Sequence, residues 1–410
     1  MIDFKFERNG EVELVEEELQ SIMQSLLGKD LGFYDLPLDD GLLEEVEQYV
    51  QDVKESYDKV VVLGIGGSAL GIKTIRDVLM SPQDRDRLRI IDNVDPDFIY
   101  EMTYDLDLDR TKFVVITKSG GTTETMSLFM QMKGRCTESG LDWKDKFVFV
   151  TDPENGLLRK IGERDKIRCF DVPQNVGGRY SVLSAVGILP AAMVGVKVSE
   201  LMSGAQWMRD RFMDKSCEEN MVYQLAKFQS KFHKDGCNVN VLFPYSNKLI
   251  RFGEWYAQLL AESIGKNDGV GLTPVTALGA TDQHSQLQLY SGGPDDKMYQ
   301  FIKVRKFEND KMIGLEKDEL LSEKFGFLDG VTFGKLLNTE LGGTKESLCE
   351  LGRPICELSL ERIDTATLGA LFMLYEGATA LLGELMEVDA FNQPGVERSK
   401  VLTKEYLTKG

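Results

Sequence analysis

The stretch "KVVVLGIGGSALG", residues 59–71, decides the fold class of this chain. A short apolar run leads into a glycine-rich turn, and a helical pattern begins directly after the turn. A buried strand followed at once by a helix is typical of parallel sheets that helices cover on both faces. Gly64, Gly66 and Ala69 also fit the G-x-G-x-x-G/A pattern of dinucleotide-binding turns. The stretch therefore predicts an α/β unit whose turn holds either a dinucleotide or a smaller ligand.

The alternation of strand and helix patterns continues along the chain and then recurs. Further strands are expected at "RIIDNV" (89–94), "KFVVITKS" (112–119), "KFVFVTD" (146–152) and "KIRCFDVP" (166–173). A second series is expected at "CNVNVLFPYS" (237–246), "KMYQFIKVRKF" (297–307) and "RPICELSLERI" (353–363). Short apolar strands separated by helices predict two doubly wound α/β domains, each a mostly parallel sheet flanked by helices.

The expected elements divide the chain into five consecutive parts. These are an N-terminal helical segment at 1–57, a first α/β domain at 58–190, a helical connection at 191–236, a second α/β domain at 237–385, and a C-terminal turn and helix at 386–410. The stretch 309–346 is the most polar, and we expect an irregular surface excursion there. The segment "TLGALFMLYEGATALLGELM" (367–386) predicts a long helix that is largely buried.

The charge of the chain limits its partners. Lys and Arg number 48 and Asp and Glu number 67, so the formal net charge is −19. Nucleic acids and anionic membranes attract proteins with excess positive charge, so we expect neither as a partner. An anionic small ligand is then best bound by backbone amides at helix N-termini, which supply positive potential without net charge.

Targeting signals and metal-site patterns are missing from the sequence. The N-terminus is charged from Asp3 onward and has no apolar core of a signal peptide. No apolar run approaches the roughly 18–20 residues that a membrane span needs. The six cysteines are scattered, without a C-x-x-C pair or a Cys/His cluster. We therefore expect a soluble cytoplasmic protein with reduced thiols and no metal.

The glycine-rich turn by itself leaves its ligand open. Asp92 lies near the end of the next expected strand, where a ribose-binding acid would stand in a dinucleotide site. Gly67 and Ser68, however, place a free amide and a hydroxyl at the start of a helix, an arrangement that suits a compact anion. A purely structural turn is the third interpretation.

The stretch "TKSGGTTET", residues 117–125, favours a phosphate. It follows another expected strand and offers hydroxyls around two glycines, from Ser119, Thr122, Thr123 and Thr125. An ordinary helix cap needs only one such hydroxyl. Because the two turns follow strands of one parallel sheet, both open at its carboxyl edge, where such sheets bind ligands. We therefore predict a phosphorylated small molecule as the ligand.

Candidate acid–base groups lie in the second half of the chain. Of the two histidines, His233 lies among charged residues, whereas His284 lies in the polar turn "GATDQHSQLQLY" and suits either acid–base chemistry or a structural role. Glu262 and Gln258 are four residues apart and share one face of an expected helix, which faces either solvent or a cleft. "NVGGRYSVLSAVG" (175–187) contains Arg179 after paired glycines.

Together these stretches resemble the phosphoglucose isomerase family. The resemblance covers about residue 30 to the C-terminus and rests on "GIGGSALG", "TKSGGTTET", "NVGGRYSVLSAVG", "GEWYAQLLAESIGK" leading into "GATDQH", and "FNQPGVERSK" (391–400), in the order of the family. It implies that both α/β domains are sugar isomerase domains, and that the reaction interconverts glucose 6-phosphate and fructose 6-phosphate in glycolysis and gluconeogenesis. It also implies a phosphate pocket made of Ser68, Lys118, Ser119, Thr122 and the backbone amides around Gly67.

The resemblance further assigns roles in the reaction. Glu262 matches the base that carries a proton between C1 and C2 through a cis-enediol, and Arg179 matches the cation that stabilises the enediolate. His284 and Lys400 match residues that assist ring opening, and Gln258 and Gln393 match polar substrate contacts. The family histidine reaches the active site from the neighbouring subunit, which implies a homodimer. Because the isomerisation is redox-neutral within one molecule, it implies neither a nicotinamide nor a metal cofactor.

Three other functions stay open at this point. A non-catalytic sugar-phosphate-binding regulator would share the two glycine-rich turns without needing Glu262, His284 and Lys400 together. A dual phosphoglucose/phosphomannose isomerase would keep the same residues and differ in the pocket near C2. A dehydrogenase would need a cofactor slot that no stretch after Asp92 supplies.

Overall fold

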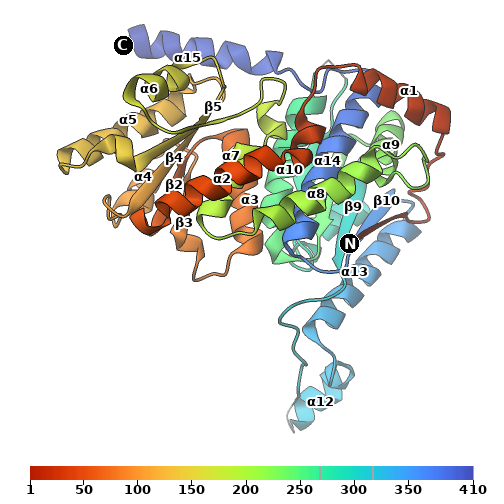
Figure 1. Ribbon diagram of the computed structural model, residues 1–410. Coiled ribbons are helices and arrows are strands. Elements are labelled where there is room, and N and C mark those ends of the chain that lie inside the picture. Colours follow the sequence, from red (N-terminus) through yellow and green to blue (C-terminus); the bar gives the residue numbers. More distant parts are fainter. Residues whose placement is uncertain (267–268, 316–317, 410) are drawn as a thin grey trace. The chain divides into compact units, whose positions relative to one another are not determined.

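A computed structural model describes residues 1–266, 269–315 and 318–409, and the chain forms two compact units (Figure 1). The glycine-loop unit consists of Leu27–Arg211 and Asp364–Gly377. The glutamate unit consists of Met1–Leu26, Phe212–Ile363 and Ala378–Gly410. Each unit contains one five-stranded sheet, and both units are assembled from stretches that are distant in the sequence.

The sheet of the glycine-loop unit is parallel throughout. Its strands, in spatial order, are β3 (Leu88–Ile91), β2 (Lys59–Leu63), β4 (Thr111–Ile116), β5 (Phe147–Thr151) and β6 (Cys169–Asp171). The helices of this unit are α2 (Asp40–Val53), α3 (Leu70–Leu79), α4 (Pro96–Thr103), α5 (Thr123–Glu138), α6 (Leu157–Asp165), α7 (Ala185–Met193) and α8 (Val198–Phe212). The residues of β3, β4 and β5 are all buried, as expected for parallel strands covered on both faces.

The sheet of the glutamate unit is parallel except at one edge. Its order is β1 (Ile2–Phe6), β10 (Ile355–Leu360), β9 (Lys297–Val304), β7 (Val239–Pro244) and β8 (Thr273–Thr276), and only β1 runs antiparallel to its neighbour. The helices are α1 (Glu16–Leu27), α9 (Met221–Lys234), α10 (Ile250–Ile264), α11 (Leu287–Gly292), α12 (Glu319–Phe325), α13 (Phe333–Glu350) and α15 (Glu397–Lys409). The prediction of two α/β sheets flanked by helices is confirmed.

Two stretches differ from the sequence-based expectation. The segment expected to be helical at the N-terminus begins with strand β1, in which Ile2, Phe4 and Phe6 alternate with polar residues. The stretch expected to be irregular contains α12 and most of α13. α13 buries only one face, including Leu341 and Leu348, so its polar composition reflects an exposed helix face rather than a loop.

One further helix, α14 (Thr365–Leu385), is long and apolar enough to cross a membrane by length and composition. The expectation that no apolar run approaches this length was therefore wrong. An 18-residue window of α14 with a mean hydropathy of 1.3 is 94% buried inside the protein, which fits a core helix. Within the glycine-loop unit α14 packs closely on α8, because a Cβ at Gly369 would lie 1.9 Å from the carbonyl oxygen of Leu201.

Candidate active site

The two glycines at the turn after β2 serve different purposes. Gly66 has a φ of +58°, a left-handed conformation that favours glycine in the tight turn between β2 and α3. Gly67 has ordinary dihedral angles, but a Cβ there would lie 2.3 Å from the carbonyl oxygen of Gly178. The turn that carries Ser68 is therefore packed directly against the backbone that carries Arg179.

The acid that a dinucleotide site would need is already engaged. The Nζ atom of Lys73, on α3, lies 2.5 Å from the carboxylate of Asp92 at the end of β3. Both side chains are less than one-fifth exposed, so the pair is well shielded from solvent. A ribose would have to displace Lys73 from Asp92, which argues against a dinucleotide at this turn.

The turn after β4 forms a cluster of hydroxyl groups. The Oγ1 atom of Thr117 lies 3.1 Å from Oγ1 of Thr122 and 3.5 Å from Oγ of Ser119. The backbone N–H of Gly121 donates to the Ser119 hydroxyl at 3.3 Å. Thr117 is buried and was absent from the sequence-based set. Its position directly after the last residue of β4 could have identified it as a site residue, because that position lies at the carboxyl edge of the sheet.

Lys118 connects this turn to a third segment. Its Nζ donates to the carbonyl oxygens of Gln174 and Val176, at 2.7 and 2.9 Å. Burial lowers the pKa of Lys118, against a smaller opposing effect of Asp152. Arg179, three residues beyond Val176, is buried and lies over the ring of Tyr180.

The residues that the sequence predicts to form the phosphate pocket therefore lie in one neighbourhood of the glycine-loop unit. The segment 174–179 contacts the turn after β2 through Gly178 and the turn after β4 through Lys118. β2 and β4 are adjacent parallel strands, so their turns open at the same edge of the sheet. The structure thus brings together Gly67, Ser68, Lys118, Ser119, Thr122 and Arg179 around free helix N-termini and hydroxyls, chemistry that suits a phosphate group.

In the glutamate unit, the carboxylate of Glu262 receives two amide donors. The Nε2 of Gln258, one turn earlier on α10, donates to Oε1 at 3.0 Å. The Nε2 of Gln393, in the turn before α15, donates to Oε2 at 2.8 Å. Glu262 is therefore held at both oxygens, by its own helix and by a segment distant in the sequence. The expected shared helix face of Gln258 and Glu262 agrees with this geometry, whereas the contact of Gln393 with Glu262 was not expected from the sequence.

Lys400 and His284 are both exposed. Lys400 is on α15, where it pairs with Glu397 at 2.7 Å and is mostly exposed. His284 is exposed and follows Gln283, whose side chain accepts a hydrogen bond from Tyr245 at the carboxyl end of β7.

Within one chain, most of the length of helix α10 lies between Glu262 and the end of the sheet that carries His284. A Cβ on Gly253, in the first turn of α10, would touch Thr276 at the carboxyl end of β8. Glu262 is nine residues further along the helix, about 14 Å toward the amino end of the strand. His284 belongs to the carboxyl end of the sheet, so the two residues lie at opposite ends of the α10–β8 pair.

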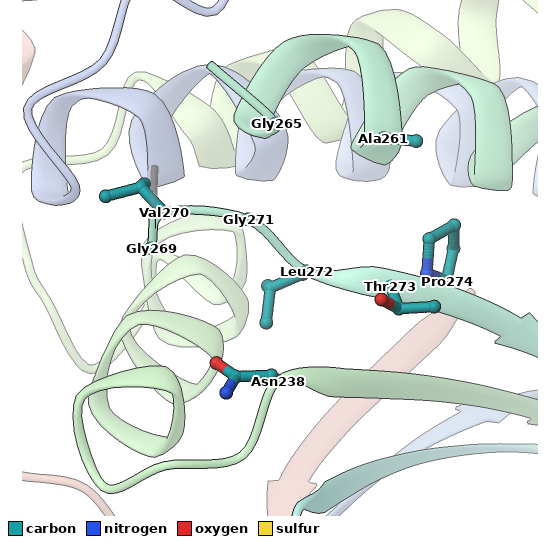
Figure 2. Close-up of a pocket in the computed structure, with 9 residues that line it drawn as sticks. All are labelled: Asn238, Ala261, Gly265, Gly269, Val270, Gly271, Leu272, Thr273 and Pro274. Atoms are coloured by element: carbon teal, nitrogen blue, oxygen red, sulfur yellow. The ribbon is translucent and has the colours of Figure 1, made fainter. Parts of the chain in front are cut away.

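A hollow of about 460 Å³ opens near the end of α10, beside the amino ends of β7 and β8 (Figure 2). Figure 2 shows Ala261 and Gly265 on one side and Leu272, Thr273 and Asn238 on the other. Among the described residues, those that line the hollow include no acid, base or cation. This described part of the lining offers packing and backbone groups but none of the chemistry of proton transfer.

Comparison with known proteins places this geometry in a family. A family model described as phosphoglucose isomerase matches residues 44–409. The chain belongs to the phosphoglucose isomerase family. The family resemblance expected from the motifs is thereby confirmed.

Two curated relatives and one solved structure match nearly the whole chain. A probable glucose-6-phosphate isomerase of Methanococcus maripaludis is 37% identical over 98% of this chain and 90% of its own length. A glucose-6-phosphate isomerase of Carboxydothermus hydrogenoformans is also 37% identical, over 98% of this chain and 91% of its own. A hypothetical protein of Thermus thermophilus superimposes with a TM-score of 0.90, at 34% identity, covering 99% of this chain and 100% of that one.

The fold is shared more widely than the sequence. A glucose-6-phosphate isomerase of Chlamydia trachomatis superimposes with a TM-score of 0.78 at 22% identity, over 89% of this chain and 72% of that one. At that identity the likeness shows the fold of the phosphoglucose isomerases and leaves the site residues to be argued from the geometry above.

Proposed function

We propose that this chain interconverts glucose 6-phosphate and fructose 6-phosphate, a step of glycolysis and gluconeogenesis. The observation that carries the proposal is the carboxylate of Glu262 held at both oxygens by Gln258 and Gln393, in a chain of the phosphoglucose isomerase family. A carboxylate fixed in this way can take a proton from a carbon next to a carbonyl group without first reorganising.

The phosphate group of the substrate is bound by the glycine-loop unit. In this proposal the backbone amides around Gly67 and at the N-termini of α3 and α5 donate hydrogen bonds to the anion. The hydroxyls of Ser68, Ser119 and Thr122 and the ammonium of Lys118 complete the pocket. This binding fixes the phosphate end of the sugar.

The proton transfer runs on Glu262. With the sugar in its open-chain form, the carboxylate removes the proton from C2 of glucose 6-phosphate, and the electron pair moves toward the C1 carbonyl oxygen. Arg179 stabilises the negative charge that develops in the cis-enediol intermediate. The hydroxyl proton of O2 then passes to O1, and the protonated glutamic acid returns its proton to C1, which yields fructose 6-phosphate and restores the carboxylate. Gln258 and Gln393 contact the substrate while they orient the base.

His284 and Lys400 assist the opening of the sugar ring. Because His284 and Glu262 lie at opposite ends of the α10–β8 pair in one chain, the role of His284 requires a second copy. We therefore propose a homodimer in which the histidine of each subunit serves the site of the other. Lys400 exchanges its contact with Glu397 for the ring oxygen when the sugar binds.

The chain works in the cytoplasm in this proposal. All six cysteines are free thiols, and five of them are buried, which fits a reducing compartment. Mannose 6-phosphate is the second substrate to test, because a dual-specificity isomerase would use the same residues.

The proposal is tested by turnover and by isotope exchange. Purified enzyme in deuterated water is expected to convert fructose 6-phosphate into glucose 6-phosphate that carries deuterium at C2. Glu262→Gln is expected to lower kcat by about a thousandfold, because the amide cannot accept the proton. KM should stay within a few-fold, since the phosphate contacts are untouched.

Glu254→Gln is the matched control on the same helix. Glu254 pairs with Arg251 and should tolerate the change with ordinary turnover. Absence of turnover in the wild type would leave the regulator as the better interpretation, and normal turnover of Glu262→Gln would remove Glu262 from the role of base.

A further inference from the structure

One tyrosine hydroxyl in the glutamate unit lies within hydrogen-bond distance of three side-chain amides. Tyr256, on α10, accepts from Gln229 of α9 at 2.6 Å and from Asn240 of β7 at 2.9 Å, and the amide nitrogen of Gln300 on β9 lies 3.4 Å from the same oxygen. Gln300 also donates to the amide oxygen of Asn240 at 2.8 Å. We call these four residues the Tyr256 network. It joins two helices and two strands at one oxygen atom.

The network lies in the interior, where its geometry is strongly constrained. Its four side chains are at most 2% exposed. Burial raises the pKa of the Tyr256 phenol, so the hydroxyl stays neutral and keeps its proton. Any rotation or sliding of α10 would leave buried amides without a partner, which is unfavourable in a medium that offers no water. The network therefore fixes α10 in one rotation and at one height on the sheet.

Glu262, the proposed base, and its partner Gln258 lie on the other face of the same helix. An α-helix turns by about 100° per residue, so Gln258 is about 200° and Glu262 about 240° from Tyr256 around the axis. Gln258 and Glu262 are only partly buried, whereas Tyr256 and its neighbour Trp255 are buried. The orientation of the buried face thus determines where the carboxylate on the open face points.

We infer that Tyr256 is a positioning residue for the isomerisation, which aligns Glu262 with the substrate carbons by fixing α10 on β7 and β9. This inference rests on the proposed function, since it takes Glu262 as the base. Alignment matters twice in the reaction, because the same carboxylate removes a proton from one carbon and returns it to the next. A poorly aligned acid returns the proton more slowly and loses more of it to water.

The test uses Tyr256→Phe, which removes only the hydroxyl. Glucose 6-phosphate with deuterium at C2 is converted in ordinary water, and the deuterium retained at C1 of fructose 6-phosphate is measured. We expect kcat to fall about tenfold, KM to stay within about twofold, and the retained fraction to fall at least about twofold. The retained fraction is a ratio within each turnover, so a smaller amount of folded enzyme leaves it unchanged.

Tyr299→Phe is the matched control. Tyr299 precedes Gln300 on β9 and faces the opposite side of the sheet, where its buried hydroxyl lies 3.5 Å from the carbonyl oxygen of Tyr290. This variant should lower Tm and keep both kcat and the retained fraction of the wild type. If Tyr256→Phe does not fold, Gln229→Met removes one partner of the hydroxyl, and a smaller fall in both kcat and the retained fraction is expected.

The outcomes separate this inference from the proposed function. A wild type that isomerises, together with a Tyr256→Phe enzyme whose kcat and retained fraction equal those of the wild type, overturns the positioning role and leaves the proposed function standing. The same holds for Gln229→Met if it is the variant measured. A wild type that does not isomerise overturns the proposed function first, and the inference with it.

Discussion

The two units hold their candidate residues in different ways. In the glycine-loop unit, three short segments are packed at the backbone of Gly67 and Gly178 and are joined by the Lys118 ammonium, which donates to the carbonyl oxygen of Val176. In the glutamate unit, the side-chain amides of Gln258 and Gln393 hold Glu262, while Lys400 is exposed and pairs with Glu397. The candidate phosphate site is thus organised locally by turns of one unit, whereas in the proposed function the catalytic set also needs a second copy and a movement of Lys400.

The largest expected effect comes from dividing the catalytic set between two chains. His284→Ala and Glu262→Gln should each lose at least about a hundredfold in kcat as separate proteins. If the histidine acts on the site of the partner subunit, a heterodimer of the two variants contains one intact site. Mixing equal amounts under conditions that exchange subunits should then restore about a quarter of the wild-type activity.

This experiment also has a clear contrary result. A histidine that acts within its own chain leaves every site of the mixture defective, so activity would stay at the level of the separate variants. The control is a mixture of His284→Ala with wild type, whose activity should follow the proportion of intact sites.

The next prediction tests whether close backbone packing at Gly67 shapes the candidate phosphate site. Gly67→Ala places a methyl group 2.3 Å from the carbonyl oxygen of Gly178, so the Ser68 turn and the Arg179 segment must move apart. Losing one charge-assisted hydrogen bond to phosphate should raise KM by about tenfold or more, with a smaller change in kcat. Gly134→Ala on α5 is the control, because its Cβ meets open space and the change should raise Tm. An unchanged KM would show that the backbone contact does not shape the pocket.

The sequence alone predicts features formed by neighbouring residues better than contacts between residues that are distant in the chain. The turn after β4 could be identified from its hydroxyls, because strand, turn and helix are adjacent in the chain. The pairing of β1 with β10 could not be identified, since it joins residues about 350 apart and depends on tertiary packing. Likewise, the spacing of Gln258 and Glu262 predicts a shared helix face, but the arrival of Gln393 at the same carboxylate depends on the path of the C-terminal segment.

A smaller effect is expected from the buried hydroxyl of Thr117, beside the candidate phosphate site. Thr117→Val keeps the shape of the side chain and removes the group that contacts Thr122 and Ser119. The loss of one neutral hydrogen bond should raise KM by about fivefold and leave kcat nearly unchanged. Thr111→Val, at the opposite end of β4, removes another buried hydroxyl and should lower Tm without changing KM. Equal KM values in the two variants would exclude an organising role for Thr117.

The smallest effect on activity, and a distinct effect on stability, is expected at the antiparallel edge of the glutamate unit. There Lys345 contacts both Glu7, which directly follows β1, and Glu357, which lies on the paired strand β10. Burial raises the pKa of Glu357, but the hydrogen bond and charge of Lys345 outweigh it and hold that pKa below the ordinary 4.5. A carboxyl whose pKa is lowered by folding stabilises the protein above its unfolded value and loses that stabilisation as the pH falls through its folded value.

Glu357→Gln should therefore lower the free energy of unfolding by about 1–3 kcal/mol at pH 7, with kcat nearly unchanged. The difference from the wild type should shrink as the pH falls below 4.5, because the wild-type carboxyl then takes up its proton as well. Glu346→Gln is the control, since its pair with Arg8 joins neighbouring segments but is largely exposed, and its effect should be small at every pH. A difference between Glu357→Gln and wild type that stays constant from pH 7 to below 4.5 would mean that the β1 edge is held by packing rather than by charge.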